Sequence, residues 1–181
     1  MDSIRVFTHI LISYYIKIPY RWKEICFFAD CVVAIILLIL AIRKKINIKK
    51  SISILLLFAY TILVFTSTVF SRSRIQDAQI IIDVLWIFRK IYNGESYLVG
   101  ELIYNVLMFI PIGILTPCVK SSINIRSISA MGLLISGTIE LMQMVLKCGY
   151  FETMDIICNS IGILVGYFLC CIVRKIILNT Q

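Results

Sequence analysis

Five apolar segments, each long enough to cross a bilayer, constrain this chain more than any other feature of its sequence. The hydrocarbon core of a membrane takes about 20 consecutive apolar residues of a helix. An isolated strand would leave its backbone polar groups unpaired in lipid, so each segment is expected to be helical. The sequence therefore predicts an all-α, polytopic membrane bundle with about five transmembrane helices, over residues 26–42, 51–70, 102–118, 127–146 and 155–173.

The composition excludes the main soluble alternatives. Apolar residues make up 60% of the 181 residues and charged residues only 15%, whereas soluble domains have about 45–50% and about 25%. A soluble enzyme, a disordered chain and a collagen-like repeat are therefore all disfavoured. The length leaves room for one membrane domain and for no separate soluble domain.

Charge and cysteine content predict no nucleic-acid partner, metal or cofactor. The net charge of +8 is explained by topology, because cytoplasmic loops of membrane proteins collect Lys and Arg, and no RNA-binding or helix-turn-helix pattern is present. The seven cysteines form no C-x-x-C pair and most lie in apolar runs, where cysteine behaves as a small apolar residue. A disulfide framework or zinc site is not expected.

The basic residues also predict the orientation. Residues 43–50 contain five Lys or Arg and no acid, which places this loop in the cytoplasm. Alternation then places residues 71–101 and 147–154 outside and residues 119–126 and 174–181 inside. The N-terminus would lie outside, unless the N-terminal segment also crosses the membrane. Two shorter apolar segments, residues 4–18 with His9 and residues 80–88, are predicted to be interfacial helices.

Polar residues in the predicted spans fall at one depth. Glu140 and Gln143 lie in the last turns of the fourth helix, Asp155 and Asn159 in the first turns of the fifth, and Glu101 and Asn105 in the first turns of the third, while Arg72 and Arg74 follow the second. Intramembrane polar groups are costly and usually functional. We therefore predict an outward-facing polar cluster of Arg72, Asn105, Glu140, Gln143, Asp155 and Asn159. Reversing the orientation would move the whole cluster to the cytoplasmic face.

A structural explanation of the same residues stays open. Polar groups in membrane bundles often serve only to hold helices together, with about 0.6–2 kcal/mol each, and Glu140 could pair with Arg72 or Asn159 for that purpose. Gly162 and Gly166 form a small-xxx-small pattern that favours close helix packing. Pro111 and Gly113 predict a kink in the third helix.

Three motifs in order resemble the VanZ-like family. They read N-x-x-x-F-x-P-x-G from Asn105, S-x-x-x-E-x-x-Q from Ser136, and D-x-x-x-N-x-x-G-x-x-x-G-Y from Asp155, with Arg72 extending the match upstream. The resemblance divides the chain into an N-terminal interfacial segment (1–25), an additional first helix with its basic loop (26–50) and a VanZ-like membrane domain (51–175). Residues 80–88 lack the proline that the family often has there.

The resemblance implies a multi-pass protein of the bacterial cytoplasmic membrane that lowers sensitivity to teicoplanin, a lipid-tailed glycopeptide antibiotic. On this reading the polar cluster binds or excludes an amphiphile, and the partners are membrane lipid, a lipoglycopeptide or a lipid-linked wall precursor. The alternative is a membrane enzyme that acts on a lipid or lipid-linked wall precursor through paired carboxylates. The enzyme is less favoured, because the cluster has no His and no nucleophile–base pair. Oligomers could form through the glycine faces.

Overall fold

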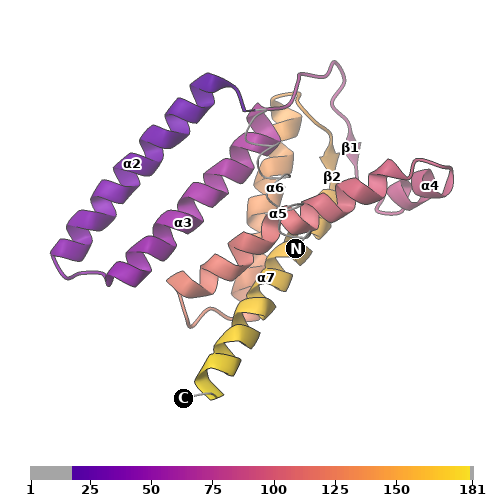
Figure 1. Ribbon diagram of the computed structural model, residues 1–181. Coiled ribbons are helices and arrows are strands. Elements are labelled where there is room, and N and C mark those ends of the chain that lie inside the picture. Colours follow the sequence, from indigo (N-terminus) through magenta and orange to yellow (C-terminus); the bar gives the residue numbers. More distant parts are fainter. Residues whose placement is uncertain (1–17, 180–181) are drawn as a thin grey trace, which may run out of the picture.

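The computed structural model describes residues 18–179, which form a helical bundle with one short pair of strands (Figure 1). Five helical segments are long and apolar enough to cross a membrane. They are α2 (Tyr20–Ile42), α3 (Ile48–Phe65) with its continuation η1 (Thr66–Phe70), α5 (Tyr97–Val119), α6 (Ile125–Val145) and α7 (Thr153–Asn179). The remaining elements are α4 (Trp86–Tyr92), β1 (Ile80–Ile81) and β2 (Phe151–Glu152). The predicted all-α, polytopic bundle is confirmed.

The two shorter apolar segments, residues 4–18 and 80–88, are the ones predicted to be interfacial helices. The expected helix over residues 80–88 is replaced by β1, a turn and the start of α4. The turn forms because the carboxylate of Asp83 accepts a hydrogen bond from the N–H of Leu85 at 2.9 Å, and Asp favours such local bonds over a helix interior. The other interfacial helix, over residues 4–18 with His9, lies outside the described residues except for Ile18.

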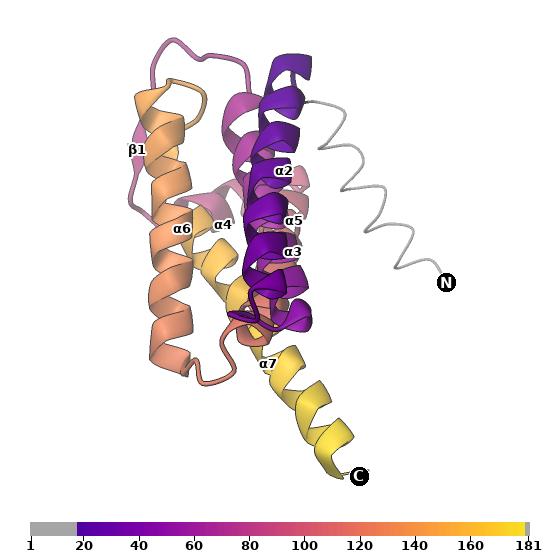
Figure 2. The ribbon, with the colours of Figure 1, turned by 90° about the vertical axis from the view of Figure 1, so that its left-hand side faces the viewer.

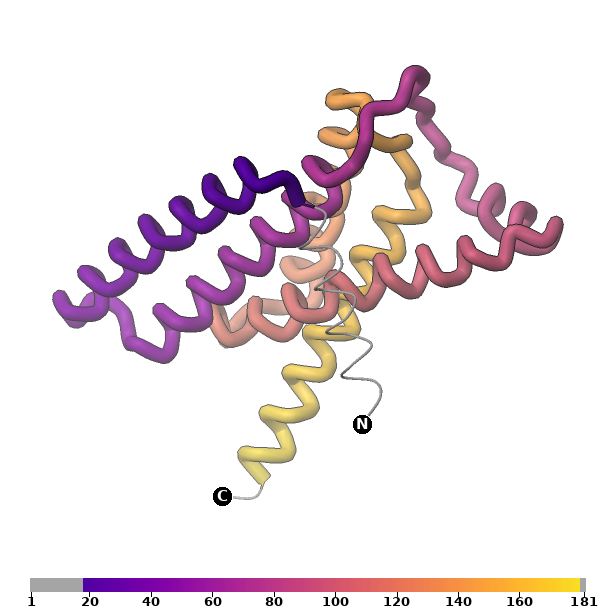
Figure 3. Tube along the Cα trace, turned by 45° about the horizontal axis from the view of Figure 1, so that its top comes forward, coloured from indigo at the N-terminus to yellow at the C-terminus, as the bar shows by residue number. Residues whose placement is uncertain are grey.

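The helices divide into a hairpin and a tighter group. α2 packs chiefly on α3, α3 packs on α5, and α7 packs on both α5 and α6. Figure 2 shows α6 on one side and α2 with α3 on the other, and Figure 3 shows the hairpin beside the rest, with the C-terminal end of α7 extending past its neighbours. The core lies where α3, η1, α5, α6 and α7 meet; it includes Val64, Val69, Phe109, Ile112, Ile128 and Ile163.

Glycines bring the backbones of α5 and α7 into contact. A Cβ on Gly113 would lie 2.0 Å from the carbonyl oxygen of Ile163, and a Cβ on Gly166 would lie 2.1 Å from that of Ile110. Gly162 approaches the carbonyl of Val106 in the same way, at 2.2 Å. Any side chain at these glycines would force the helices apart, which explains the small residues of this interface.

The turn after α6 brings two loops together at one end of the bundle. α6 ends with Lys147 in the left-handed region (φ 53°), and the N–H of Cys148 donates to the carbonyl of Gln143 at 2.8 Å, as in a Schellman motif. The N–H of Ile75 then donates to the carbonyl of Lys147 at 2.7 Å. β1 and β2 continue this contact as a parallel pair with Ile80 opposite Phe151 and Ile81 opposite Glu152. The segments after η1 and α6 therefore form one connected surface.

Candidate functional site

Four segments deliver the predicted polar residues to this end of the bundle. Glu140 and Gln143 lie in the last turns of α6, Asp155 and Asn159 in the first turns of α7, and Asn105 in the first half of α5. Arg72 lies two residues after the end of η1. The connected loops in Figure 1 lie beside these helix ends. The structure therefore gathers side chains that are up to 87 residues apart (159 − 72) at one end of the membrane domain.

Hydrogen bonds between side chains tie these segments together. Asn105 donates from Nδ2 to Oδ1 of Asp155 at 2.7 Å and so links α5 to α7. Asn159 donates to the hydroxyl of Ser136 at 2.8 Å and links α7 to α6. Hydrogen bonds between polar side chains of neighbouring helices help to hold the helix pair in register.

A third bond connects α6 to η1. Gln143 donates from Nε2 to the backbone carbonyl of Thr68 at 3.1 Å. Thr68 lies in the π-helical segment, and such segments are frequent at functional sites. The bond anchors the turn that carries Arg72 to the last turns of α6.

Glu140 is the most enclosed carboxylate of the site. Only 1% of its surface is exposed, and its Oε2 accepts a hydrogen bond from the backbone N–H of Glu152 at 3.0 Å. Neither partner considered from the sequence, Arg72 or Asn159, is hydrogen-bonded to it in residues 18–179. Glu140 is instead held by the backbone of β2, so the position of this buried carboxylate depends on the pairing of β2 with β1.

Arg72 is the cation shared by the acidic groups. Its guanidinium lies within electrostatic range of Glu140, Glu152 and Asp155. It forms no direct ion pair with any of them among the described residues, since the ion pairs there are Arg89 with Asp83 and Lys90 with Glu95. Arg72 therefore acts on these carboxylates through the field of one exposed guanidinium and not through a direct ion pair.

Gly149 lets Arg72 reach this position. A Cβ on Gly149 would lie 3.2 Å from Nη1 of Arg72 and 3.2 Å from Oε1 of Gln143. Both contacts are tighter than usual for a side chain, so a larger residue would push the guanidinium or the amide aside. The glycine therefore places the backbone of the β2 loop directly against the arginine.

The sequence reasoning did not include Glu152 and Glu101 among the site residues. Glu152 lies outside the spanning helices, and burial, followed by the nearby Asp155 and Glu101 carboxylates, raises its pKa to about 7 while Arg72 and Lys90 oppose the shift. It is therefore partly protonated near neutral pH. Glu101 is one helical turn before Asn105, and this i, i+4 spacing was the available signal. Glu152 carried no comparable signal, because the β1–β2 contact decides its position.

Two buried amide oxygens remain available as acceptors. Oε1 of Gln143 and Oδ1 of Asn159 have no hydrogen-bond partner within residues 18–179, although their side chains are only 2% and 3% exposed. Buried polar atoms in native proteins are normally paired. Each oxygen therefore keeps an unused acceptor position inside the bundle.

The site combines buried acidic and amide side chains with one exposed guanidinium. Carboxylates and amide oxygens accept hydrogen bonds and attract cations, and Arg72 binds anions. Within the described residues no group of three or more His, Cys, Asp or Glu side chains is arranged to hold a metal ion.

These features define a multi-pass helical membrane protein with a polar cluster where several spanning helices end. The family model described as VanZ/LLP1 matches residues 27–174, so the chain belongs to the VanZ/LLP1 family. The resemblance drawn from the three motifs is confirmed. The match begins within α2 and includes all the motif residues; the division at residues 25 and 50 stays a prediction. No curated protein and no solved structure matches the chain.

Proposed function

We propose that this VanZ/LLP1 protein acts in the bacterial cell envelope, where its outward-facing polar cluster binds or excludes an amphiphile and lowers sensitivity to teicoplanin-type lipoglycopeptides. The observation that carries the proposal is the convergence of Arg72, Glu140 and Asp155 from three different segments at one end of the bundle. Glu140 is bonded to the backbone of Glu152, Asp155 is bonded to Asn105, and Arg72 lies against Gly149. Charged groups in a membrane protein are retained where a ligand or a partner uses them. An amphiphile has its polar groups at this depth and its apolar tail in the bilayer.

The charge distribution supports the outward orientation. The basic loop with Arg43, Lys44 and Lys45 joins α2 to the first turn of α3, as Figure 2 shows, whereas Arg72 follows η1 at the other end of α3. Arg174, near the end of α7, donates to the carbonyl of Pro117 in the last turn of α5 at 2.6 Å. By the positive-inside rule these basic residues face the cytoplasm, and the polar cluster then faces the cell wall.

The test is teicoplanin susceptibility in a sensitive Gram-positive host. Strains carrying empty vector, wild type, Glu140→Gln and Asp155→Asn are compared at matched membrane levels of the protein. We expect wild type to reduce susceptibility and both variants to lose most of this effect, because each removes a carboxylate from the cluster. Glu24→Gln, at an exposed glutamate outside the cluster, is the matched control and should behave as wild type.

Two outcomes contradict the proposal. Wild type that leaves teicoplanin susceptibility unchanged removes the resistance function from this member of the family. If Glu140→Gln and Asp155→Asn both protect as well as wild type, the polar cluster has no part in the protection.

The enzyme alternative is supported by the arrangement of Glu140 and Asp155. The two carboxylates interact electrostatically with each other and with Arg72, and such a set can supply a general acid and a general base. Their substrate would be a membrane lipid or a lipid-linked wall precursor. Incubation of the purified protein with labelled wall-precursor lipid decides this alternative. Product formation that Glu140→Gln abolishes would favour the enzyme, and an unchanged lipid would favour binding.

A further inference from the structure

Two cavities meet beside the polar cluster, at the end of the α2–α3 hairpin. The first, of about 370 Å³, is lined by Arg72 and Arg74 together with Trp22, Phe70, Leu146 and Cys148; we name it the arginine cavity. The second, of about 300 Å³, lies between α2 and α3 and is lined by side chains that include Ile25, Ala29, Ile62 and Phe65; we name it the apolar groove. Trp22 and Phe70 line both, so the two spaces adjoin.

The arginine cavity has the charge of an anion site. Its lining contains two guanidinium groups and no carboxylate. Arg74 is exposed and has no hydrogen bond or ion pair with any residue in the described range 18–179. Guanidinium groups recognise phosphate oxygens through paired N–H donors. The stacked rings of Trp22 and Phe70, whose centroids are 3.7 Å apart, form an apolar wall of this cavity.

The apolar groove has the character of a site for a hydrocarbon chain. None of its lining residues is charged, and all belong to α2, α3 or η1, within segments that are long and apolar enough to span the membrane. Only 6% of the most apolar stretch of α2 is buried within the protein, which shows that this helix packs loosely. The groove can therefore take a hydrocarbon chain without the separation of a tightly packed helix pair.

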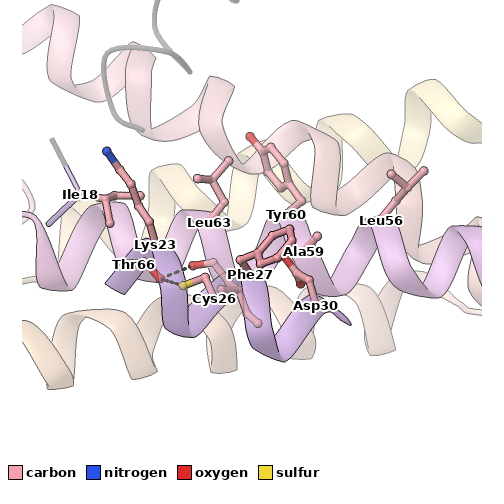
Figure 4. A pocket seen from close by; sticks show the side chains of 11 residues that line it. Ile18, Lys23, Cys26, Phe27, Asp30, Leu56, Ala59, Tyr60, Leu63 and Thr66 are labelled. Carbon is pink, nitrogen blue, oxygen red and sulfur yellow. Dashed lines mark hydrogen bonds between the residues drawn. The ribbon is translucent and has the colours of Figure 1, made fainter. Parts of the chain in front are cut away.

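The other large cavity of the hairpin suits a chain less well. It also has a volume of about 370 Å³, and Figure 4 shows Lys23, Asp30 and Tyr60 among its lining side chains. Oδ1 of Asp30 has no hydrogen-bond partner in residues 18–179, and contact with a hydrocarbon would leave it unsatisfied. Cys26 and Thr66, joined by a 3.2 Å hydrogen bond (Figure 4), line both this cavity and the apolar groove, so these two spaces adjoin as well.

We propose that the arginine cavity and the apolar groove together bind one membrane lipid with a phosphate group in its head, with the phosphate at Arg72 and Arg74 and one acyl chain along the groove between α2 and α3. This inference deepens the proposed function and rests on it, because it names the chemical class of the amphiphile. Arg72 is shared between the phosphate and the carboxylates of the polar cluster. Donor groups elsewhere on the headgroup then lie near Glu152 and Asp155.

The experiment measures lipid retention by the full-length protein in detergent, using native mass spectrometry. Phosphatidylglycerol is the phosphate lipid, diacylglycerol is the matched lipid without phosphate, and inorganic phosphate is the competitor without a chain. We expect wild type to retain phosphatidylglycerol, to bind diacylglycerol at least about tenfold more weakly, and to keep its lipid in millimolar inorganic phosphate. The factor corresponds to the loss of about one charge-assisted hydrogen bond.

Two variants test the two halves of the site. Arg74→Gln removes an exposed cation and is expected to weaken phosphatidylglycerol binding about tenfold. Ala29→Phe fills the apolar groove and is expected to weaken it by a similar factor. The matched controls are Arg126→Gln and Ala130→Phe, at exposed positions of α6 outside both cavities, and both should bind as wild type.

Several results would overturn the lipid site. Wild-type affinity in both Arg74→Gln and Ala29→Phe places the lipid elsewhere. If diacylglycerol binds as tightly as phosphatidylglycerol, the arginines do not recognise the phosphate group. If millimolar inorganic phosphate displaces phosphatidylglycerol, the cavity is an anion site and does not bind the whole lipid. If the protein does not retain phosphatidylglycerol but still protects against teicoplanin in a Glu140-dependent way, the lipid site is wrong and the proposed function stands. Lipid binding without teicoplanin protection overturns the proposed function alone.

Discussion

The α5–α7 pair and the α2–α3 hairpin are both made of apolar helices, but they associate in different ways. In α7, 39% of the most apolar stretch is buried within the protein, against 6% in α2. Backbone meets backbone at Gly113 and Gly166, whereas α2 contributes a single buried side chain, Leu37. The hairpin is instead joined by the Cys26–Thr66 hydrogen bond and the stacked rings of Trp22 and Phe70.

The comparison shows that apolar character alone does not pack helices in a membrane. Lipid tails are as apolar as leucine, so burying a leucine against another helix gains little. Close approach through small residues and hydrogen bonds between polar side chains supply the attraction. α5, α6 and α7 have both, and they form the rigid frame of the polar cluster. α2 and α3 have few of either, which leaves room beside them for a lipid.

The largest expected effect is on the α5–α7 contact. Gly166→Ala places a Cβ about 2.1 Å from the carbonyl oxygen of Ile110, and the helices must separate. We expect a loss of about 3 kcal/mol in the free energy of unfolding, measured by thermal unfolding in detergent. The matched control is Gly137→Ala on α6, where nothing lies within 4 Å of the new Cβ; it should unfold at the wild-type temperature or above. Equal stability of the two variants would contradict the tight interface.

The next effect concerns the buried carboxylate that joins α6 to β2. Glu140→Ala leaves the N–H of Glu152 without its acceptor, and we expect a loss of about 2 kcal/mol. Glu140→Gln keeps an acceptor oxygen and should lose less. Hydrogen exchange at the Glu152 amide distinguishes the two variants, because the exchange should be much faster in Glu140→Ala than in wild type or in Glu140→Gln. Unchanged exchange would show that β1–β2 pairing holds this amide without Glu140.

The hairpin should tolerate a cavity that the frame does not. Leu37→Ala removes the one buried side chain of α2, but lipid can fill the space, so the expected loss is about 1 kcal/mol. Ile112→Ala on α5, at a position with 0% exposure, should lose about 3 kcal/mol. Thermal unfolding of both variants in one detergent provides the comparison. A larger loss for Leu37→Ala would reverse the contrast between hairpin and frame.

The smallest effect is a pH dependence from Glu152. Its pKa is raised from about 4.5 to about 7, first by burial and then by neighbouring carboxylates. The folded state therefore binds this proton more tightly than the unfolded state does, so the stabilisation is complete below about pH 4.5 and is lost as the pH rises to about 7. Glu152→Gln should make the unfolding temperature less dependent on pH in this window. If the difference in unfolding temperature between wild type and Glu152→Gln stays constant from pH 4.5 to 8, the raised pKa of Glu152 is contradicted.

The sequence by itself determined the helices and which helix ends carry the polar residues. A run of apolar residues longer than the bilayer core leaves a helix as the only way to pair its backbone, so the five spans followed from local information. The helical spacing of Glu140 and Gln143, and of Asp155 and Asn159, placed them on one face of each helix. The glycine pattern of residues 162 and 166 indicated close packing, although its partner on α5 was unknown.

Only the tertiary structure decided how the ends of these helices connect. The pairing of Ile80 with Phe151 joins segments 71 residues apart (151 − 80), and it places the N–H of Glu152 on Glu140 and adds Glu152 to the cluster. The arginine cavity likewise combines Trp22, Arg74 and Leu146 from three distant parts of the chain. Such contacts depend on which loops meet after the helices have packed. No local spacing encodes them, because each partner becomes available only when the rest of the bundle is in place.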